Sequence, residues 1–145
     1  MEVISFKSEH LEYLIAHGIT DEKLMPILNQ WTGQSLEAGG ETYTLWHEDK
    51  PIMIGGIKQH WFNRGEAWVI FGLTDRKDFV RIHNIVQKFL DRSPFKRIEM
   101  VVDYEFFEGH RWARALGFVK EADCMKGYHA DGRNASLYAL VKNAA

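Results

Sequence analysis

The sequence predicts a mixed α/β domain, of the α+β kind, whose sheet is mostly antiparallel with a central pair of parallel strands. Three observations support this fold class. Apolar and polar residues alternate from Glu41 onward, which is the spacing of strands in an antiparallel meander. An amphipathic stretch, Thr74–Leu90, separates two strand-like segments, so these are expected to be parallel neighbours joined by a right-handed crossover. Further on, a helical pattern stops at Gly117 and a strand follows at once.

The N-terminal part combines one short strand with predicted helices. Val3–Phe6 is a strand candidate, and Ser8 is a suitable N-cap for a helix over Glu9–His17. Gly18 is expected to end this helix, because glycine tolerates the backbone conformation of a helix C-terminus. A second helix is expected within Thr20–Trp31, with one of the first two residues of this range as its cap.

Three strands in meander order are predicted next. Glu41–His47 alternates at strand spacing, and a turn leads into the second strand, Ile52–Trp61. Paired glycines at Gly55–Gly56 indicate a bulge or a close approach of a neighbouring backbone. A tight turn at Asn63–Gly65 precedes Ala67–Leu73, whose almost entirely apolar sequence is typical of a central strand covered on both faces.

The crossover helix has the clearest helical pattern in the chain. Apolar residues recur at spacings of three and four between Phe79 and Leu90, with Thr74 or Asp75 as the cap. The helix is expected to end at Ser93–Pro94.

The remaining segments predict a strand, a helix and a closing hairpin. Arg97–Tyr104 alternates cleanly, with its apolar residues on one face. Phe106–Leu116 is the next helix, in which Gly109 offers a point of close packing. The final strands, Phe118–Tyr128 and Ala135–Lys142, are expected to be joined by a turn at Asp131-Gly132.

Composition limits the class of protein. A chain of 145 residues, 46% of them hydrophobic, can bury one sizeable core, so we expect a single domain over residues 1–145. The 18 basic and 20 acidic side chains give a net charge of -2, which argues against general nucleic-acid binding.

Cysteine and histidine usage indicates neither a disulfide nor a metal site. Cys124 is the single cysteine and is expected to be a buried, inert thiol in a reducing compartment. The seven histidines show no spacing typical of metal ligands. The chain has neither a secretory signal nor a membrane-spanning apolar stretch, so we expect a cytoplasmic protein that does not enter a membrane.

The order of these elements, together with the helix-to-strand junction Leu116-Gly117-Phe118, resembles the GNAT superfamily of N-acetyltransferases. The resemblance covers nearly the whole chain, and the run ETYTLWHEDKPIMIGGIKQHWF is also similar to small GNAT-like proteins of T7-type tailed phages. It implies helices on both faces of the sheet and direct transfer of an acetyl group from acetyl-CoA to an amine. The acceptor would be a small molecule or a protein, the enzyme a monomer or homodimer, and its compartment the host cytoplasm if a phage encodes it.

The resemblance also places the cosubstrate. In GNAT proteins the pyrophosphate of acetyl-CoA sits at the start of the crossover helix, where backbone N–H groups and the helix dipole favour an anion. Here the corresponding residues are Phe71, Gly72, Leu73, Thr74, Arg76, Lys77, Asp78 and Phe79. The glycine-rich loop of the family is missing. Arg76 and Lys77 can contact the phosphate directly, although Asp75 and Asp78 would repel the same anion. In the alternative, Asp75 caps the helix, Asp78 complements its dipole, and Arg76 and Lys77 are solvated.

A second departure concerns catalysis. The tyrosine that many family members carry four residues before the junction glycine is replaced by Ala113, which cannot protonate a leaving thiolate. His60, Glu66 and Tyr104 are the candidate catalytic bases. Each also has a structural interpretation: His60 as an edge histidine, Glu66 as a solvated turn residue, and Tyr104 as a packed aromatic whose hydroxyl lies at the rim.

Two functions therefore follow from the sequence. One is an acetyl-CoA-dependent N-acetyltransferase. The alternative is a non-catalytic binding or structural module of the same fold, for example a phage protein that acts on a host factor or resides in the virion. The glycine-poor link into the crossover helix favours the module, whereas the predicted strand pair and helix favour the enzyme.

Overall fold

The computed structural model describes residues 1–19 and 41–143 of the chain. The predicted second helix lies outside these residues. The chain contains two compact units, Met1–Lys58 with Ala67–Arg76 and Gln59–Glu66 with Lys77–Ala145. The elements in chain order are β1 (Glu2–Ser5), α1 (Ser8–His17), β2 (Glu41–His47), β3 (Lys50–Trp61), β4 (Arg64–Phe71), α4 (Arg76–Arg92), β5 (Arg97–Asp103), α5 (Phe107–Ala115), β6 (Val119–Met125) and β7 (Ala135–Val141).

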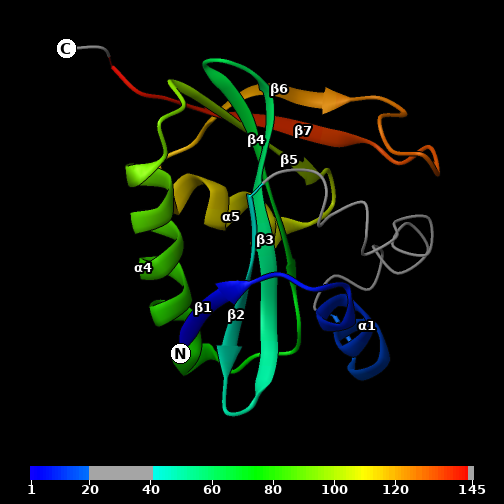
Figure 1. The fold of residues 1–145 in the computed structure, drawn as a ribbon. Helices are drawn as coiled ribbons and strands as arrows, with labels where there is room; N and C mark the ends of the chain where they lie inside the picture. The colour runs from blue at the N-terminus through cyan, green and yellow to red at the C-terminus, as the bar shows by residue number, and fades with distance from the viewer. Residues whose placement is uncertain (20–40, 144–145) are drawn as a thin grey trace. The chain divides into compact units, whose positions relative to one another are not determined.

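The strands form one mixed seven-stranded sheet in the order β1-β2-β3-β4-β5-β7-β6, labelled in Figure 1. Strand β4 pairs with β5 in parallel, in register from Arg64 opposite Arg97 to Glu66 opposite Glu99. The pairs β1–β2, β2–β3, β5–β7 and β6–β7 are antiparallel. This confirms the predicted fold class, including the parallel pair. No described helix is both long and apolar enough to cross a membrane.

The first unit buries an apolar core between α1 and its strands. The core residues are Phe6, Leu11, Leu14, Ile19, Ile54 and Ile70. Helix α1 begins one residue earlier than predicted, so Ser8 is its first residue and Lys7 takes the N-cap position. The Lys7 backbone N–H donates to His10 Nδ1 at 3.1 Å, which replaces the hydroxyl cap expected from Ser8. Gly18 ends the helix with φ 104°, as predicted.

Two features of the β2–β3 region follow from local backbone chemistry. Glu48 and Asp49 adopt φ values of 52° and 63° and form the two-residue turn between the strands. A Cβ at Gly55 would lie 2.8 Å from the Trp68 carbonyl oxygen, and one at Gly56 would collide with the Glu41 carbonyl oxygen. The predicted close backbone approach is therefore confirmed, because neither position has room for a side chain.

Strand β4 differs from its prediction in two respects. It begins at Arg64, so Arg64, Gly65 and Glu66 belong to the strand and the turn is confined to Phe62 and Asn63. Only Gly65 and Ile70 are buried in this strand, so the expected cover over both faces is wrong for the described part of the protein. An apolar sequence reports what can be buried, whereas burial itself depends on which elements pack against the strand.

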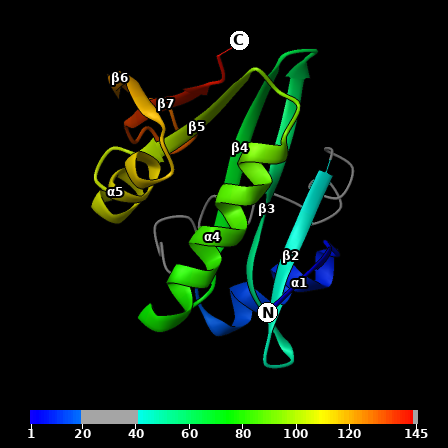
Figure 2. The ribbon, with the colours of Figure 1, turned by 90° about the vertical axis from the view of Figure 1, so that its left-hand side faces the viewer.

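The second unit packs α4 and α5 with β5, β6 and β7 (Figures 1 and 2). Its buried apolar residues include Ile82, Leu90, Ile98, Met100, Val102, Ala113, Leu116, Phe118 and Tyr138. A Cβ at Gly109 would lie 2.8 Å from Val102 Cγ1, so this glycine lets α5 pack closely against β5, as predicted. The apolar face predicted for β5 is confirmed for Ile98, Met100 and Val102, which are buried, whereas Tyr104 lies beyond the strand and is 40% exposed.

The junction after α5 is a Schellman motif. Gly117, with φ 96°, donates its N–H to the Arg114 carbonyl, and the Phe118 N–H donates to the Ala113 carbonyl, both at 3.0 Å. Leu116 and Phe118 are buried on either side of the glycine. The sequence prediction of a helix, a glycine stop and an anchored strand is confirmed.

The closing hairpin is looser than predicted. Strand β6 ends at Met125 and β7 begins at Ala135, so residues 126–134 form the connection in place of a two-residue turn. Gly132 has φ 87°, as its position in a turn requires, and the Arg133 N–H donates to Asp131 Oδ1 at 3.1 Å. The β6–β7 register also shifts twice, between Lys120 and Ala122 and between Ala122 and Met125.

Candidate active site

His60 and Glu66, two of the three predicted catalytic residues, are hydrogen-bonded to each other. His60 is near the end of β3 and Glu66 is near the start of β4, and His60 Nε2 lies 3.2 Å from Glu66 Oε1. Because an ionised carboxylate only accepts hydrogen bonds, Nε2 donates and carries a proton. A neutral His60 therefore has its lone pair on Nδ1, which no described residue contacts by a hydrogen bond. The side chains are 27% and 32% exposed, so solutes can reach them.

A charged network lies on the same face of the parallel strands. Arg64 and Glu66 are two residues apart in β4 and so share a face, and Glu66 is in register with Glu99. Arg64 donates two hydrogen bonds to Glu99, from Nε at 2.9 Å and from Nη2 at 2.7 Å. Arg97 Nε donates to the same carboxylate at 2.7 Å, and Arg97 Nη2 donates to Glu121 at 2.6 Å.

This network fixes the charge of its members. The hydrogen bonds from Arg64, and then those from Arg97, lower the pKa of Glu99 to about 2 although burial opposes ionisation. Hydrogen bonds to the carboxylates raise the pKa of both arginines. The hydrogen bond from Arg97 also lowers the pKa of Glu121. Glu99 is therefore ionised near neutral pH and is unsuited to exchanging protons there.

Tyr128 is a further titratable residue that the sequence did not single out. Burial raises the pKa of its hydroxyl, and the negative charges of Glu66 and Glu99 raise it further. Tyr128 lies in the β6–β7 connection, distant in sequence from both, so no local pattern marks it.

The structure does not bring Tyr104 into this pair. It lies just beyond β5, and its side chain is 40% exposed, so it is less packed than an interior aromatic. The Tyr104 N–H donates to the Asn134 carbonyl at 3.0 Å, and its carbonyl accepts from His110 Nε2 at 2.9 Å. Within the described residues, its hydroxyl forms no hydrogen bond with His60 or Glu66.

Two buried polar groups near the end of β5 were also missed. Asp103 accepts a hydrogen bond from Arg133 Nη1 at 2.6 Å and another from the Glu105 N–H at 3.0 Å. His110 Nδ1 lies 2.8 Å from the hydroxyl of Tyr138, which is completely buried. Because His110 Nε2 donates to a carbonyl, Nδ1 of the neutral ring accepts from Tyr138. Both groups are structural, since their polar atoms are already engaged.

The residues assigned to acetyl-CoA link β4 to α4. The backbone N–H of Gly72 donates to the Ile52 carbonyl at 2.8 Å, and a Cβ there would lie 2.8 Å from Leu14 Cδ2. Gly72 is therefore needed for packing in the first unit. Arg76 and Lys77 open α4, are exposed, and form no ion pair with any described residue. Two available cations at a helix N-terminus fit a pyrophosphate, whereas a glycine cradle is missing.

Ala113, at the position where the family's catalytic tyrosine is expected, is completely buried in α5. It packs in the core with Leu116 and Phe118 of the junction, so its small side chain serves packing. Among the described residues, α5 therefore supplies no acid from this position.

Comparison with solved structures identifies the fold. The chain matches a probable acetyltransferase from Staphylococcus epidermidis with a TM-score of 0.79 at 9% identity, over 98% of this chain and 99% of that one. It matches the ribosomal-protein-S18-alanine N-acetyltransferase of Escherichia coli with a TM-score of 0.71 at 13% identity, over 99% and 96%. A GNAT-family acetyltransferase from Bacillus anthracis matches with a TM-score of 0.66 at 14% identity, over 96% and 93%.

These matches show that the chain has the GNAT fold over nearly its full length. At such identities they show the fold alone. No family model matches the sequence, and no curated protein matches it significantly.

Proposed function

We propose that this protein is an N-acetyltransferase that moves the acetyl group of acetyl-CoA directly to an amine. The observation that carries the proposal is the hydrogen bond from His60 Nε2 to Glu66 Oε1 at 3.2 Å, formed next to the parallel strand pair of a GNAT fold. Direct acyl transfer needs a base for the attacking amine, and this pair presents one to solvent.

The chemistry assigned to the pair follows from its hydrogen bond. Glu66 holds the Nε2 proton of His60, which orients the ring and stabilises its cationic form. The lone pair on His60 Nδ1 then takes a proton from the amine as its nitrogen bonds to the thioester carbonyl carbon. The carbon–sulfur bond breaks, the amide is released, and coenzyme A leaves as the thiolate. The thiolate takes a proton from solvent, and His60 returns its proton to solvent. Acetyl-CoA supplies an acyl group already activated as a thioester.

The proposed coenzyme contacts lie in the link Phe71–Phe79, including the predicted residues Phe71, Gly72, Leu73, Thr74, Asp78 and Phe79. Arg76 and Lys77 would hold the pyrophosphate by charge-assisted hydrogen bonds at the N-terminus of α4, in place of the glycine-rich loop. Tyr104 remains a third catalytic candidate. The acceptor would be a small-molecule or protein amine.

The second candidate is a GNAT-fold module without catalysis. The alanine at position 113 favours it, because alanine cannot supply the acid that many family members carry there. The narrower sequence likeness to phage proteins would make such a module a phage product that acts on a host factor or in the virion. The two candidates differ in whether acetyl-CoA binds and turns over.

Calorimetric titration with acetyl-CoA, followed by measurement of coenzyme A thiol release with a panel of amines, separates the candidates. We expect saturable binding and amine-dependent thiol release. A ligand at a hundred times its Kd stabilises the folded state by about 2.7 kcal/mol, so a rise in melting temperature should accompany binding. Absence of both binding and stabilisation at millimolar acetyl-CoA would overturn the enzyme assignment. Binding without release for any amine would favour the non-catalytic module.

A further inference from the structure

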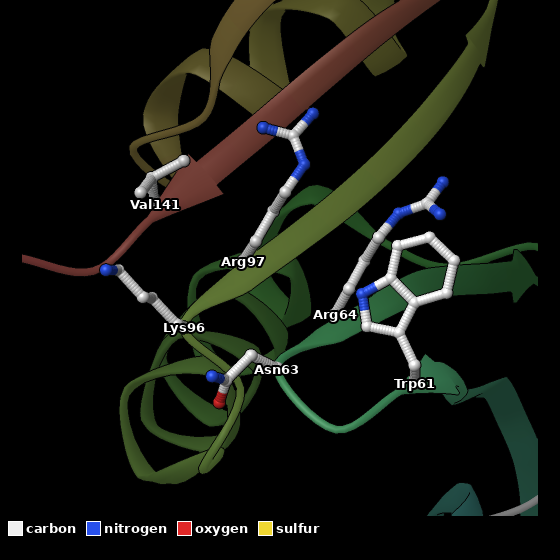
Figure 3. Close-up of a pocket in the computed structure, with 6 residues that line it drawn as sticks. All are labelled: Trp61, Asn63, Arg64, Lys96, Arg97 and Val141. Atoms are coloured by element: carbon white, nitrogen blue, oxygen red, sulfur yellow. The ribbon is translucent and has the colours of Figure 1, made fainter.

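A second concave site lies in the second unit, at the ends of four strands. Its lining residues are Trp61, Asn63, Arg64, Lys96, Arg97 and Val141, and its volume is about 510 Å³ (Figure 3). Trp61 is the last residue of β3, Arg64 the first of β4, Arg97 the first of β5 and Val141 the last of β7. We call it the strand-end pocket. Its volume lies within the range of small-molecule sites.

Backbone hydrogen bonds hold the walls of this pocket together. The Arg97 N–H donates to the Asn63 carbonyl at 3.0 Å, and the Lys142 N–H donates to the Lys96 carbonyl at 2.8 Å. Lys142 also donates its side-chain ammonium to the carbonyls of Leu90, at 2.7 Å, and Ser93 at the end of α4. The strand ends and the helix end are thereby fixed to one another, so the pocket is preformed.

Every charged residue that lines the pocket is a cation. Its walls contribute three cations, Arg64, Lys96 and Arg97, and the carboxylates paired with them are Glu99 and Glu121. Lys96 forms no ion pair with a described residue. Arg64 binds Glu99 through Nε and Nη2, which leaves the N–H groups of Nη1 without a carboxylate among the described residues. An anion entering the pocket would therefore meet uncommitted donors.

An exposed aromatic ring forms one wall. Trp61 is 63% exposed, and the Arg64 guanidinium carbon lies 4.7 Å from the centre of its ring. Figure 3 shows the Trp61 ring beside Arg64, with Arg64 and Arg97 projecting in the same direction from neighbouring strands. Arg64, itself bound to Glu99, covers one face of the indole. The other face of this exposed ring is suited to stacking with a flat ring.

We infer that the strand-end pocket binds an aromatic anion, with a flat ring against Trp61 and its phosphate or carboxylate group toward Arg64, Arg97 and Lys96. The inference is independent of acetyl transfer, because it uses neither the His60–Glu66 pair nor the coenzyme segment. The chemistry is common to mononucleotides and to small aromatic acids, so the test includes both.

The test is a titration of the full chain followed by heteronuclear NMR. The five tryptophans give five indole N–H signals, and that of Trp61 is assigned as the signal lost in Trp61→Phe. Phenyl phosphate combines ring and acid, whereas inorganic phosphate and benzyl alcohol each supply one part. We expect phenyl phosphate to shift the Trp61 signal with saturation, at least about tenfold more tightly than either part. If uridine monophosphate binds more tightly than phenyl phosphate, the ligand is a mononucleotide. If it binds more weakly, the ligand is a small aromatic acid.

Variants locate the site. Lys96→Gln is expected to weaken phenyl phosphate binding about fivefold to tenfold at the Trp61 signal, and Trp61→Ala by a similar factor when binding is measured by calorimetry. Lys50→Gln makes the same charge change at the opposite end of β3 and should leave binding unchanged. All these side chains except Trp61 are solvated cations, so a circular dichroism spectrum should confirm that the variants fold. The inference is overturned if phenyl phosphate leaves the Trp61 signal unmoved, or if inorganic phosphate alone binds as tightly.

Discussion

Arg64 of β4 holds Glu99 of β5 through two parallel hydrogen bonds, 2.9 and 2.7 Å long, across the parallel strand pair. The carboxylate is only 6% exposed and also accepts from Arg97. The ion pair thus links the two strands whose pairing defines the fold, and it orders the face on which the proposed catalytic pair lies.

Glu99 should make stability depend on pH in acid. Its folded-state pKa of about 2 lies below the ordinary value of 4.5, so its contribution is complete above pH 4.5 and is lost as the pH falls toward 2. Glu99→Gln should lower the free energy of unfolding at pH 7 by on the order of 3 kcal/mol, because two arginines lose a buried partner. The difference from wild type should shrink between pH 4.5 and 2. Urea unfolding at several pH values measures it.

Glu12→Gln, an exposed change on α1, is the matched control and should alter stability little at any of these pH values. Glu121 will retain some acid dependence in Glu99→Gln, because its pKa is lowered as well. A difference between Glu99→Gln and wild type that stayed constant from pH 7 to pH 2 would contradict the assigned pairing.

The His60–Glu66 pair should control the rate of acetyl transfer. His60→Ala is expected to reduce kcat by about 10²- to 10⁴-fold, the range typical of losing a general base. Glu66→Gln keeps an oxygen that accepts from His60 Nε2 but loses the charge, so its loss should be smaller. Steady-state kinetics with acetyl-CoA measure both. His17→Ala, at an exposed residue of α1, is the control, and equal activity of His60→Ala and wild type would remove His60 from the mechanism.

Tyr138→Phe tests the buried hydrogen bond to His110. The change leaves His110 Nδ1 without its donor in a buried environment, which should cost about 1–3 kcal/mol of unfolding free energy. Tyr13→Phe removes a hydroxyl from a partly buried tyrosine of α1 and should cost much less. Thermal or chemical unfolding compares the two, and a neutral Tyr138→Phe would show that the hydroxyl contributes nothing to stability.

Gly117 should resist replacement for conformational reasons. A Cβ there would meet only Leu140 Cδ1, at the ordinary contact distance of 3.8 Å, so the cost comes from φ 96° rather than from a clash. Gly117→Ala should therefore destabilise the fold by about 1 kcal/mol, and Gly117→Asn by less, because asparagine tolerates positive φ better. The midpoints of denaturant unfolding rank the stabilities of the two variants. A Gly117→Ala variant more stable than Gly117→Asn would contradict the Schellman assignment.

Sequence periodicity predicted most elements because it is a local property. The patterns of the strands, the glycine stop and the crossover helix each lie within a short stretch of sequence. Gly117 indicated the junction because glycine tolerates the backbone conformation at a helix end. Such local patterns could not predict which residues pair across the sheet. Arg64 and Glu99 are 35 positions apart, and their ion pair depends on a register that only the folded strands define.

The candidate site was predictable in part. His60 and Glu66 were identified separately from their places near a turn, but their contact depends on where β4 begins, which was predicted too late in the sequence. No sequence pattern singled out Tyr128, because the connection that contains it was predicted as a strand and a hairpin turn. The strand-end pocket was also not predicted from the sequence, because the residues that line it lie near the ends of four strands and are far apart in the sequence.

The two register shifts in β6 bear on whether this edge of the sheet can pair with the sheet of a second molecule. β6 ends the strand order of the described sheet, so one side of its backbone has no strand partner there. The register shifts at Lys120, Ala122 and Met125 bend this edge strand, and the Lys120–Asp123 ion pair places charge beside it. A second sheet needs a straight, neutral edge to extend the ladder. The β6 edge is therefore poorly suited to pairing with the sheet of another copy.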